Sequence, residues 1–405
     1  MKQLIILLTL VSLITYSSLA QEIAQWRGPN RDGIYPETGL FKSWPVTGPA
    51  LLWHFDELGE GHSSAAVTSD RIFTTGMING IGYLYSFDLT GKLLWKIPYG
   101  EEWTESWPGV RSTPLVYNGK IYLISGFGKL VCRNADNGDL VWTIDVLKDF
   151  SAPNIKWGIT ENLLIDGNKL FCTPGGPEAD VVAIDRLTGK VIWRCKAMGE
   201  ESAYCSPTLI NHNNRKIFVT QTANSIIGID AESGKFLWSQ NQPNKYSVHA
   251  NTPIYFNGSV YTASGYGQGG VQIKLSADGN SITETWRNQS LDHRMGGFVL
   301  INGLIYGSDD SNKAWFAVDW KTGKDVYSEK ITGRGNIIAA DGLLYLYSDN
   351  GEMVLAQPTA TGFTKISSFK VPFGTAQHWA HQVIKDGKLY IRHGNSLMVY
   401  DIRNK

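Results

Sequence analysis

Aromatic, imidazole and guanidinium side chains recur in short polar segments that each precede an apolar run. These segments contribute His62, Trp107, Arg111, Trp157, Tyr204, His249, Arg294, Arg334, Trp379 and His381. Arginine and histidine hydrogen-bond to anionic or hydroxylated groups, whereas tryptophan and tyrosine offer broad apolar rings. If the fold brings the segments together, they predict a ligand-binding pocket. The alternative is that the segments are polar simply because they are in contact with water.

The elements between these segments follow a repeated pattern. Residues 181–193 read VVAIDRLTGKVIW, which predicts a strand, a tight turn at Thr188 and Gly189, and a second strand ending on Trp193. Similar hairpins are expected at 87–95, 134–142, 229–238 and 318–327, with a weaker copy at 358–366. The apolar residues alternate or occur in short runs, which favours strands over helices.

The residue that ends each hairpin recurs at a regular spacing. The equivalent positions are Trp53, Trp95, Trp142, Trp193, Trp238, Trp286, Tyr327 and Ile366. A period of roughly 40 to 50 residues made only of strand and turn signals is typical of a β-propeller with one four-stranded blade per repeat.

The two ends of the repeat region predict how the ring closes. The last unit, 381–403, offers only three strands, and the apolar run 50–55 is left without partners before the first complete blade. We therefore expect an all-β, eight-bladed propeller over 50–405, in which the N-terminal strand completes the last blade. Closure of the ring removes exposed strand edges. A seven-bladed ring is the alternative.

Residues 1–49 are expected to lie outside the blades. Lys2, the apolar stretch 4–14 and the small residues before Gln21 predict a cleavable signal peptide over 1–20 and export to the periplasm or beyond the cell. No other segment has the length of a membrane span. Residues 21–49 contain the sequence WRGPNRDG and are expected to form an arm on the propeller surface, with a functional loop as the alternative.

Composition limits the partners. Lys plus Arg and Asp plus Glu each number 37, so the chain lacks the basic excess of a nucleic-acid binder. The 43 glycines and 14 tryptophans suit many short strands joined by tight turns. Export permits disulfides, and Cys195 and Cys205 are candidates for a pair; the alternative is buried free thiols. The spacing of the four cysteines does not resemble a zinc site.

The segment AIDRLTGKVIW (183–193) closely resembles the repeat of the quinoprotein-dehydrogenase, or PQQ-like, propeller family. The resemblance covers nearly the whole chain after Gln21 and implies eight blades in which each tryptophan docks onto the next blade. BamB-like scaffolds of outer-membrane β-barrel assembly share this repeat with the dehydrogenases. The repeat therefore predicts a fold and does not by itself distinguish a scaffold from an enzyme.

The resemblance to the dehydrogenases also implies a possible set of catalytic residues. Those enzymes bind PQQ against an aromatic floor, with Ca²⁺ held by a Glu and an Asn and with an Asp as base. Glu161 and Asn251 would then be the metal ligands and Asp292 the catalytic base. This chain departs from the dehydrogenase pattern because it has no adjacent cysteine pair, no long insertions and no Cys-x-x-Cys-His motif.

Two main functions remain from the sequence. The first is an exported, monomeric, non-catalytic propeller without cofactor that binds an envelope protein, peptide or glycan at its channel face. The second is a PQQ- and calcium-dependent alcohol or sugar dehydrogenase. A different enzyme or a sensor built on the histidine, arginine and tryptophan residues is a third reading.

Overall fold

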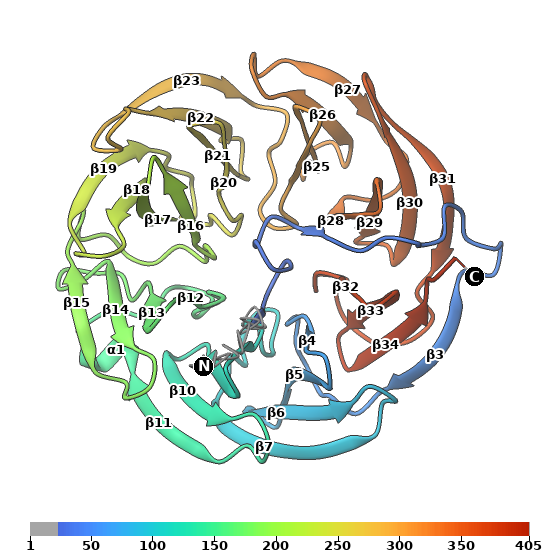
Figure 1. Cartoon of the computed structure of the whole chain (residues 1–405), viewed down its shortest axis with the longest axis horizontal. Helices are drawn as coiled ribbons and strands as arrows, with labels where there is room; N and C mark the ends of the chain where they lie inside the picture. Colours follow the sequence, from blue (N-terminus) through green and yellow to red (C-terminus); the bar gives the residue numbers. More distant parts are fainter. Residues whose placement is uncertain (1–22, 405) are drawn as a thin grey trace, which may run out of the picture.

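The computed structural model describes residues 23–404 and shows eight β-sheets arranged in a ring (Figure 1). The prediction of an eight-bladed, all-β propeller is confirmed, and the seven-bladed alternative is wrong. The signal peptide predicted for 1–20 lies outside the described residues. Within 23–404 the only α-helix is the single turn α1 (Val146–Asp149), and no helix there is long and apolar enough to span a membrane.

Each blade has four strands ordered from the channel to the rim, and in blades 1 to 7 these four are consecutive in the chain. Blade 1 contains β4 (Ala66–Val67), β5 (Arg71–Ile78), β6 (Ile81–Asp88) and β7 (Leu93–Glu101), and blade 2 contains β8 (Leu115–Tyr117), β9 (Lys120–Ile124), β10 (Lys129–Asn134) and β11 (Leu140–Asp145). Blade 3 contains β12 (Leu164–Asp166), β13 (Lys169–Cys172), β14 (Val181–Asp185) and β15 (Val191–Cys195). Blade 4 contains β16 (Thr208–His212), β17 (Arg215–Gln221), β18 (Ser225–Asp230) and β19 (Phe236–Asn241).

Blades 5 to 8 continue in the same order. Blade 5 contains β20 (Ile254–Phe256), β21 (Ser259–Ser264), β22 (Gly269–Leu275) and β23 (Ile282–Asn288), and blade 6 contains β24 (Val299–Ile301), β25 (Leu304–Ser308), β26 (Trp315–Asp319) and β27 (Asp325–Glu329). Blade 7 contains β28 (Gly335–Ala340), β29 (Leu343–Ser348), β30 (Glu352–Thr359) and β31 (Gly362–Lys370). Blade 8 contains β32 (Val383–Lys385), β33 (Lys388–His393), β34 (Ser396–Asp401) and β3 (Ala50–Phe55).

The ring closes as the sequence predicts. Strand β3, the N-terminal apolar run, pairs antiparallel with β34 in a register that aligns Ala50 with Asp401 and Phe55 with Leu397. The outer strand of blade 8 therefore comes from the opposite end of the chain. This pairing covers the edge that the last three strands would otherwise expose.

The outer hairpin shows why the repeated sequence takes this shape. In blade 3, one oxygen of Asp185 accepts hydrogen bonds from the backbone nitrogens of Leu187 and Thr188 and from the Thr188 hydroxyl. Gly189 follows with a φ of 74°, which favours glycine. Asp230 accepts likewise from the Ser233 nitrogen and hydroxyl, and Asp319 from those of Thr322, so the turn-forming side chains recur in these repeats.

Neighbouring blades contact one another through the residue that ends each hairpin. The Trp142 indole lies against Gly189 of blade 3, and its Nε1 donates to the Arg186 carbonyl at 2.9 Å. The Trp193 ring lies in the same way against Gly234 of blade 4. Apolar residues of the facing sheets, such as Phe171 and Phe218, are fully buried between the blades. Each blade thus buries its faces against its two neighbours.

The arm that precedes β3 does not stay on the surface, and this corrects the prediction made for WRGPNRDG. In Figure 1 it runs from the centre of the ring outward to β3 at the rim. On the way, β1 (Ile23–Ala24) pairs antiparallel with β8, and β2 (Ile34–Tyr35) pairs parallel with β28. Between these strands the chain lies in the central channel, where Trp26, Arg27 and Arg31 are buried.

Candidate functional site

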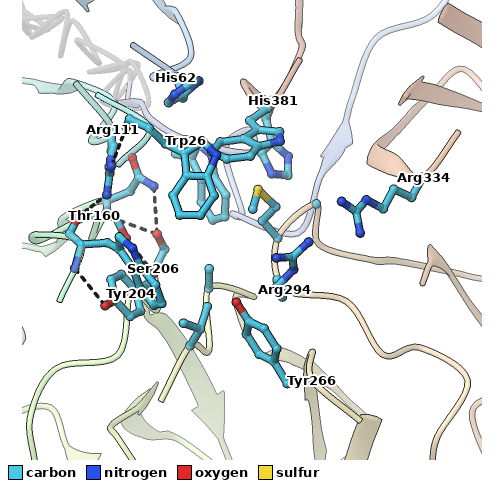
Figure 2. Close-up of a pocket in the computed structure, with 18 residues that line it drawn as sticks. Trp26, His62, Arg111, Thr160, Tyr204, Ser206, Tyr266, Arg294, Arg334 and His381 are labelled. Carbon is cyan, nitrogen blue, oxygen red and sulfur yellow. Dashed lines mark hydrogen bonds between the residues drawn. The ribbon is translucent and has the colours of Figure 1, made fainter. Parts of the chain in front are cut away.

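A pocket of about 320 Å³ opens on the channel face, where the loops before the innermost strands of all eight blades meet. Figure 2 shows side chains from around the ring directed toward this space. Nine of the ten residues predicted for ligand binding line it: His62, Trp107, Arg111, Trp157, Tyr204, Arg294, Arg334, Trp379 and His381. The geometric condition for a shared site is therefore met for these nine, whereas their role in binding stays a prediction.

His249 is the exception among the predicted binding residues. Its side chain is fully buried below the channel face, with Nε2 3.1 Å from the Ala223 carbonyl oxygen and Nδ1 3.5 Å from the Asn244 amide. Burial lowers the pKa of His249 to about 4. The histidine holds two loops together and does not line the pocket; its neighbours Val248 and Ala250 do.

The arm contributes Trp26 to the pocket wall and two arginines to the channel beside it. Arg27 donates to the carbonyl oxygens of Phe298 and Ile337, at 2.6 and 3.1 Å, in blades 6 and 7. Arg31 donates to the carbonyl oxygens of Leu163 and Pro207, at 2.7 and 2.9 Å, next to blades 3 and 4. The two guanidinium groups therefore tie widely separated blades to one segment that occupies the channel.

Neither arm arginine forms a salt bridge with a carboxylate among residues 23–404. Burial lowers the pKa of both Arg27 and Arg31 to about 10, so each remains protonated at neutral pH. Arg392 is a third buried guanidinium: it donates to the Thr75 and Gly394 carbonyl oxygens at 2.6 and 2.9 Å. Carbonyl dipoles stabilise these cations, and the carboxyl groups of Asp32 near Arg27 and Glu161 near Arg31 also favour their charged forms.

Arg111 positions two of the aromatic walls. Its guanidinium donates to the carbonyl oxygens of Trp107, at 2.7 Å, and of Trp157. Burial lowers its pKa to about 10, and it too stays charged. Behind it, the buried Glu102 accepts from the Tyr99 hydroxyl and the Gly126 nitrogen. Burial raises the pKa of Glu102 to about 7, which weakens the negative charge opposite Arg111 near neutral pH.

Arg294 and Arg334 differ from Arg111 because acidic residues hold them. Asp310 lies between them, 2.5 Å from Arg294 Nε and 2.9 Å from Arg334 Nη1. Asp349 also contacts Arg334, at 3.2 Å. Burial alone would raise the pKa of Asp310, but His293 and the two arginines outweigh it and lower this pKa. The ion pairs fix both arginines at the pocket wall and reduce their net charge.

Aromatic rings make up most of the remaining wall. The Trp107 ring centroid lies 6.2 Å from that of Trp157 and 6.0 Å from that of Trp379, with interplanar angles of 61° and 48°. Tyr266 also lines the pocket, and its ring centroid lies 4.6 Å from that of Tyr246; about two fifths of each residue is exposed. The rings form a concave surface of tilted faces rather than a parallel-sided slot.

Several pocket residues have a backbone conformation that bulky side chains rarely adopt. The φ angle is 54° at Trp107, 68° at Tyr204 and 66° at Tyr266; in the adjacent arm it is 62° at Arg27 and 60° at Arg31. Left-handed conformations of such residues cost free energy and concentrate at functional sites. The Asn-Gly hairpins elsewhere in the chain adopt positive φ with residues that tolerate it.

The two histidines of the pocket differ in their hydrogen bonds. His381 Nδ1 lies 3.1 Å from Arg27 Nη1, and because a guanidinium only donates, this nitrogen accepts and the ring is neutral. His62 has two buried ring nitrogens, and neither has a hydrogen-bond partner among residues 23–404. Burial, together with Arg392 and Arg111, lowers the pKa of His62 to about 3, so this ring is neutral as well.

The three residues suggested for a calcium centre do not fit one. The Glu161 carboxylate accepts from the Thr173 nitrogen and hydroxyl, and Asn251 contacts Ala263, His293 and Gly297 through its amide. Asp292 accepts from Gly267 and Ser311. None of the three lines the pocket, and residues 23–404 contain no cluster of three His, Cys, Asp or Glu side chains able to hold a metal.

Sequence reasoning missed part of the pocket. Its other lining residues are Trp26, Thr160, Asn162, Ser206, Val248, Ala250, Tyr266, Met295 and Gly296. Most lie in the segments that supplied the predicted residues, so position before an innermost strand was the available signal. The four cysteines, by contrast, are all buried free thiols, which leaves the Cys195–Cys205 pair unformed.

Comparison with known proteins identifies the family to which the chain belongs. The sequence model of the family described as "Outer membrane protein assembly factor BamB" matches residues 80–329, more than half of the chain. The chain belongs to this PQQ-like repeat family. The outer membrane protein assembly factor BamB of Kangiella koreensis is 26% identical over 210 residues, which are 51% of this chain and 49% of that protein.

Other relatives of this PQQ-like propeller carry the names of enzymes. The tetrathionate hydrolase of Acidithiobacillus ferrooxidans is 26% identical over 231 residues, 53% of this chain and 44% of the relative. Quinoprotein alcohol dehydrogenase PedH of Pseudomonas putida is 28% identical over 174 residues, 40% of this chain and 28% of the relative. The chain spans about half the length of the first curated relatives it matches.

Solved structures agree on the fold. BamB from Moraxella catarrhalis has a TM-score of 0.63 at 13% identity, with 88% of this chain and 98% of that chain covered. A europium-containing methanol dehydrogenase has a TM-score of 0.68 at 13% identity, with 92% and 90% covered. Assembly factors and enzymes thus share this propeller, and the function must be argued from the pocket.

Proposed function

We propose that the protein is an exported, non-catalytic binding module that holds an envelope protein, peptide or glycan in the pocket of its channel face. The observation that carries this proposal is the composition of the pocket wall. It contains three arginines, two histidines and six tryptophan or tyrosine rings, and no carboxylate or thiol. Such a wall suits recognition through stacking and hydrogen bonds, and it lacks a paired acid and base.

The histidines do not replace the missing acid–base pair. His381 Nδ1 is occupied by Arg27, and the pKa of His62, lowered to about 3, makes that imidazole a weak base at neutral pH. The hydroxyl of Ser206 is hydrogen-bonded to Asn162, and that of Thr160 donates to the Tyr204 carbonyl. An envelope location is in keeping with the expected signal peptide and with relatives named as outer membrane protein assembly factors.

The test is thermal stabilisation of the mature protein by three probes: the peptide fraction of digested envelopes, the glycan fraction, and PQQ with Ca²⁺. Trp107, which is 44% exposed at the pocket, is replaced in Trp107→Ala. Leu187→Ala, at an outer hairpin and 49% exposed, is the matched control. We expect one envelope fraction to raise the Tm of wild type and Leu187→Ala but not of Trp107→Ala.

Two results would contradict the proposal. Equal stabilisation of Trp107→Ala would move the binding surface away from the channel face. Saturable binding of PQQ that requires Ca²⁺ would instead support the dehydrogenase alternative and call for an alcohol and sugar substrate screen.

A further inference from the structure

We propose that the ligand of this pocket is a proline-rich peptide segment in the extended polyproline II conformation. This inference rests on the proposed binding function and adds the ligand class. Three features of the accessible wall support it: indole N–H groups without a partner, hydrogen-bond acceptors that are already occupied, and a series of tilted aromatic faces.

The tryptophans of the pocket differ from those at the blade contacts in their indole nitrogens. At three blade contacts Nε1 donates to a backbone carbonyl oxygen of the next blade, at 3.0, 2.9 and 3.1 Å, from Trp95, Trp142 and Trp286. Nε1 of Trp107, Trp157 and Trp379 has no such partner among residues 23–404. Trp107 is 44% exposed, and the other two are partly exposed. The unpaired indole nitrogens that are sealed from solvent in that range belong to tryptophans outside the pocket. The wall therefore offers indole donors to a ligand.

Hydrogen-bond acceptors beside these indoles are already occupied. The carbonyl oxygens of Trp107 and Trp157 accept from Arg111. That of Tyr204 accepts from Thr160, and no carboxylate of the described chain lines the pocket. A wall that mainly donates suits a ligand that mainly accepts.

A proline segment is such a ligand. Each proline has a carbonyl oxygen and no N–H, so it can accept from the indoles without bringing a donor of its own. The polyproline II helix has no internal hydrogen bonds, which leaves its carbonyl oxygens free. An ordinary peptide brings an N–H with every residue, and a saccharide brings a donor with every hydroxyl. Both would leave donors without a partner in the pocket, at a cost in free energy.

Five aromatic rings follow one another along the wall and the surface next to it. In the order Trp379, Trp107, Trp157, Tyr246 and Tyr266, successive centroids lie 6.0, 6.2, 6.3 and 4.6 Å apart. The interplanar angles are 48°, 61°, 65° and 63°, so the rings present angled faces rather than one flat surface. Grooves lined by aromatic rings bind proline-rich segments, which lose little entropy because their conformation is preformed. The volume of about 320 Å³ limits the enclosed part to a short segment.

The charges beside these rings exclude a cationic ligand. The Lys156 ammonium lies 4.9 Å from the Trp157 ring centroid, and the Arg294 guanidinium carbon lies 5.3 Å from that of Tyr266. These side chains take positions that a methylammonium group or a lysine of a ligand would need, and they would repel it. The segment is therefore expected to lack lysine and arginine, and the test uses uncharged probes.

The experiment is calorimetric titration of the mature protein with octaproline, with an alternating alanine–glycine octapeptide and with maltohexaose. Both peptides have acetylated and amidated ends, so they differ in the proline rings and in the backbone N–H groups. We expect octaproline to bind at least about tenfold more tightly than either other probe, since each unsatisfied donor weakens binding. Equal affinity for the two peptides, tighter binding of maltohexaose, or no binding of octaproline would overturn the inference.

Tryptophan-to-phenylalanine variants separate the indole donor from the aromatic face. Trp107→Phe and Trp157→Phe should each weaken octaproline binding about fivefold, the effect of one lost hydrogen bond, without lowering the Tm. Trp95→Phe is the matched control: it loses the bond to the Asp136 carbonyl oxygen at a blade contact, so the Tm should fall while octaproline binds as before. Wild-type affinity in both pocket variants would contradict the role of the indole donors.

Nuclear magnetic resonance of the indole N–H groups observes the same contact directly. The signals that disappear in Trp107→Phe and Trp157→Phe identify these two residues in the wild-type spectrum. We expect both signals to move downfield as octaproline is added, while the Trp95 signal stays in place. Signals of Trp107 and Trp157 that do not move at saturating octaproline would contradict the proposed hydrogen bonds.

The same titrations distinguish failure of this inference from failure of the proposed function. If octaproline does not bind while an envelope fraction still stabilises wild type and not Trp107→Ala, the ligand class is wrong and the binding module stands. If neither octaproline nor any envelope fraction binds, both proposals are rejected.

Discussion

At the outer rim, Asp185, Thr188 and Gly189 form a turn that returns in other blades with nearly the same residues; at the channel face, the pocket residues differ from loop to loop. The rim turns place glycine where φ is positive, whereas the channel face forces Trp107 and Tyr204 into that region. The rim turns recur because every blade uses them to contact its neighbour. The channel face carries residues that blade contact does not require, and there we propose that the ligand binds.

The largest effect on stability is expected from a substitution that disrupts a turn at the rim. At Gly234, whose φ is 75°, an added Cβ would lie 2.6 Å from Trp193, so Gly234→Val forces both overpacking and backbone strain. We expect a loss of several kcal/mol, on the order of 3 or more, in urea unfolding. Gly167→Val is the control: φ there is 58°, but nothing lies within 4 Å of the added Cβ, so strain alone should cost about 1–2 kcal/mol. Equal losses would mean that the indole contact between blades contributes little.

The second prediction concerns the arm in the channel. Arg27→Met leaves the carbonyl oxygens of Phe298 and Ile337 without this donor, at about 1–3 kcal/mol for each buried group. Differential scanning calorimetry should show a clear fall in Tm, whereas Arg194→Met, at an exposed position on β15, should change it little. A Tm for Arg27→Met close to that of wild type would show that the arm does not hold the blades together.

The third prediction is a pH dependence of stability. Burial raises the pKa of Glu102 from 4.5 to about 7, so the folded protein binds more protons than the unfolded chain between these pH values. The contribution of Glu102 is therefore most favourable below pH 4.5 and falls by on the order of 3 kcal/mol as the pH rises through 7. Glu102→Gln should flatten this slope in urea titrations, and Glu105→Gln, exposed in the same loop, should not. An unchanged slope in Glu102→Gln would contradict the assignment.

The smallest stability effect is expected within the pocket. Trp107 is 44% exposed and holds a strained φ of 54°, so Trp107→Ala should change the free energy of unfolding by less than about 1 kcal/mol. Its effect should appear in ligand binding instead. A large loss of stability in Trp107→Ala would show that the pocket wall is a structural element like the rim.

The same contrast explains what the sequence could predict. The sequence predicted eight blades and the closing strand β3 from the spacing of Trp53, Trp95 and their equivalents. This was possible because each repeat makes the same contact with the neighbouring blade. Nine of the ten predicted binding residues reached the pocket because position before an innermost strand fixes the face on which a residue lies.

What the sequence could not predict depends on long-range contacts. The path of WRGPNRDG into the channel is set by carbonyl oxygens more than a hundred residues away, such as those that bind Arg31. His249 lies in the right loop but turns inward to the Ala223 carbonyl. Glu161, Asn251 and Asp292 have the residue types of a calcium site, yet backbone groups occupy their polar atoms. Residue type and loop position do not determine these orientations.

The most direct test of the central claim, that the channel face and not the rim carries the binding function, is hydrogen–deuterium exchange. Wild-type protein would be compared with and without the envelope fraction that stabilises it. We predict protection of 103–111 and 155–162, the loops that hold Trp107, Arg111 and Trp157. Protection confined to outer hairpins such as 185–189, with no change in those loops, would contradict the account.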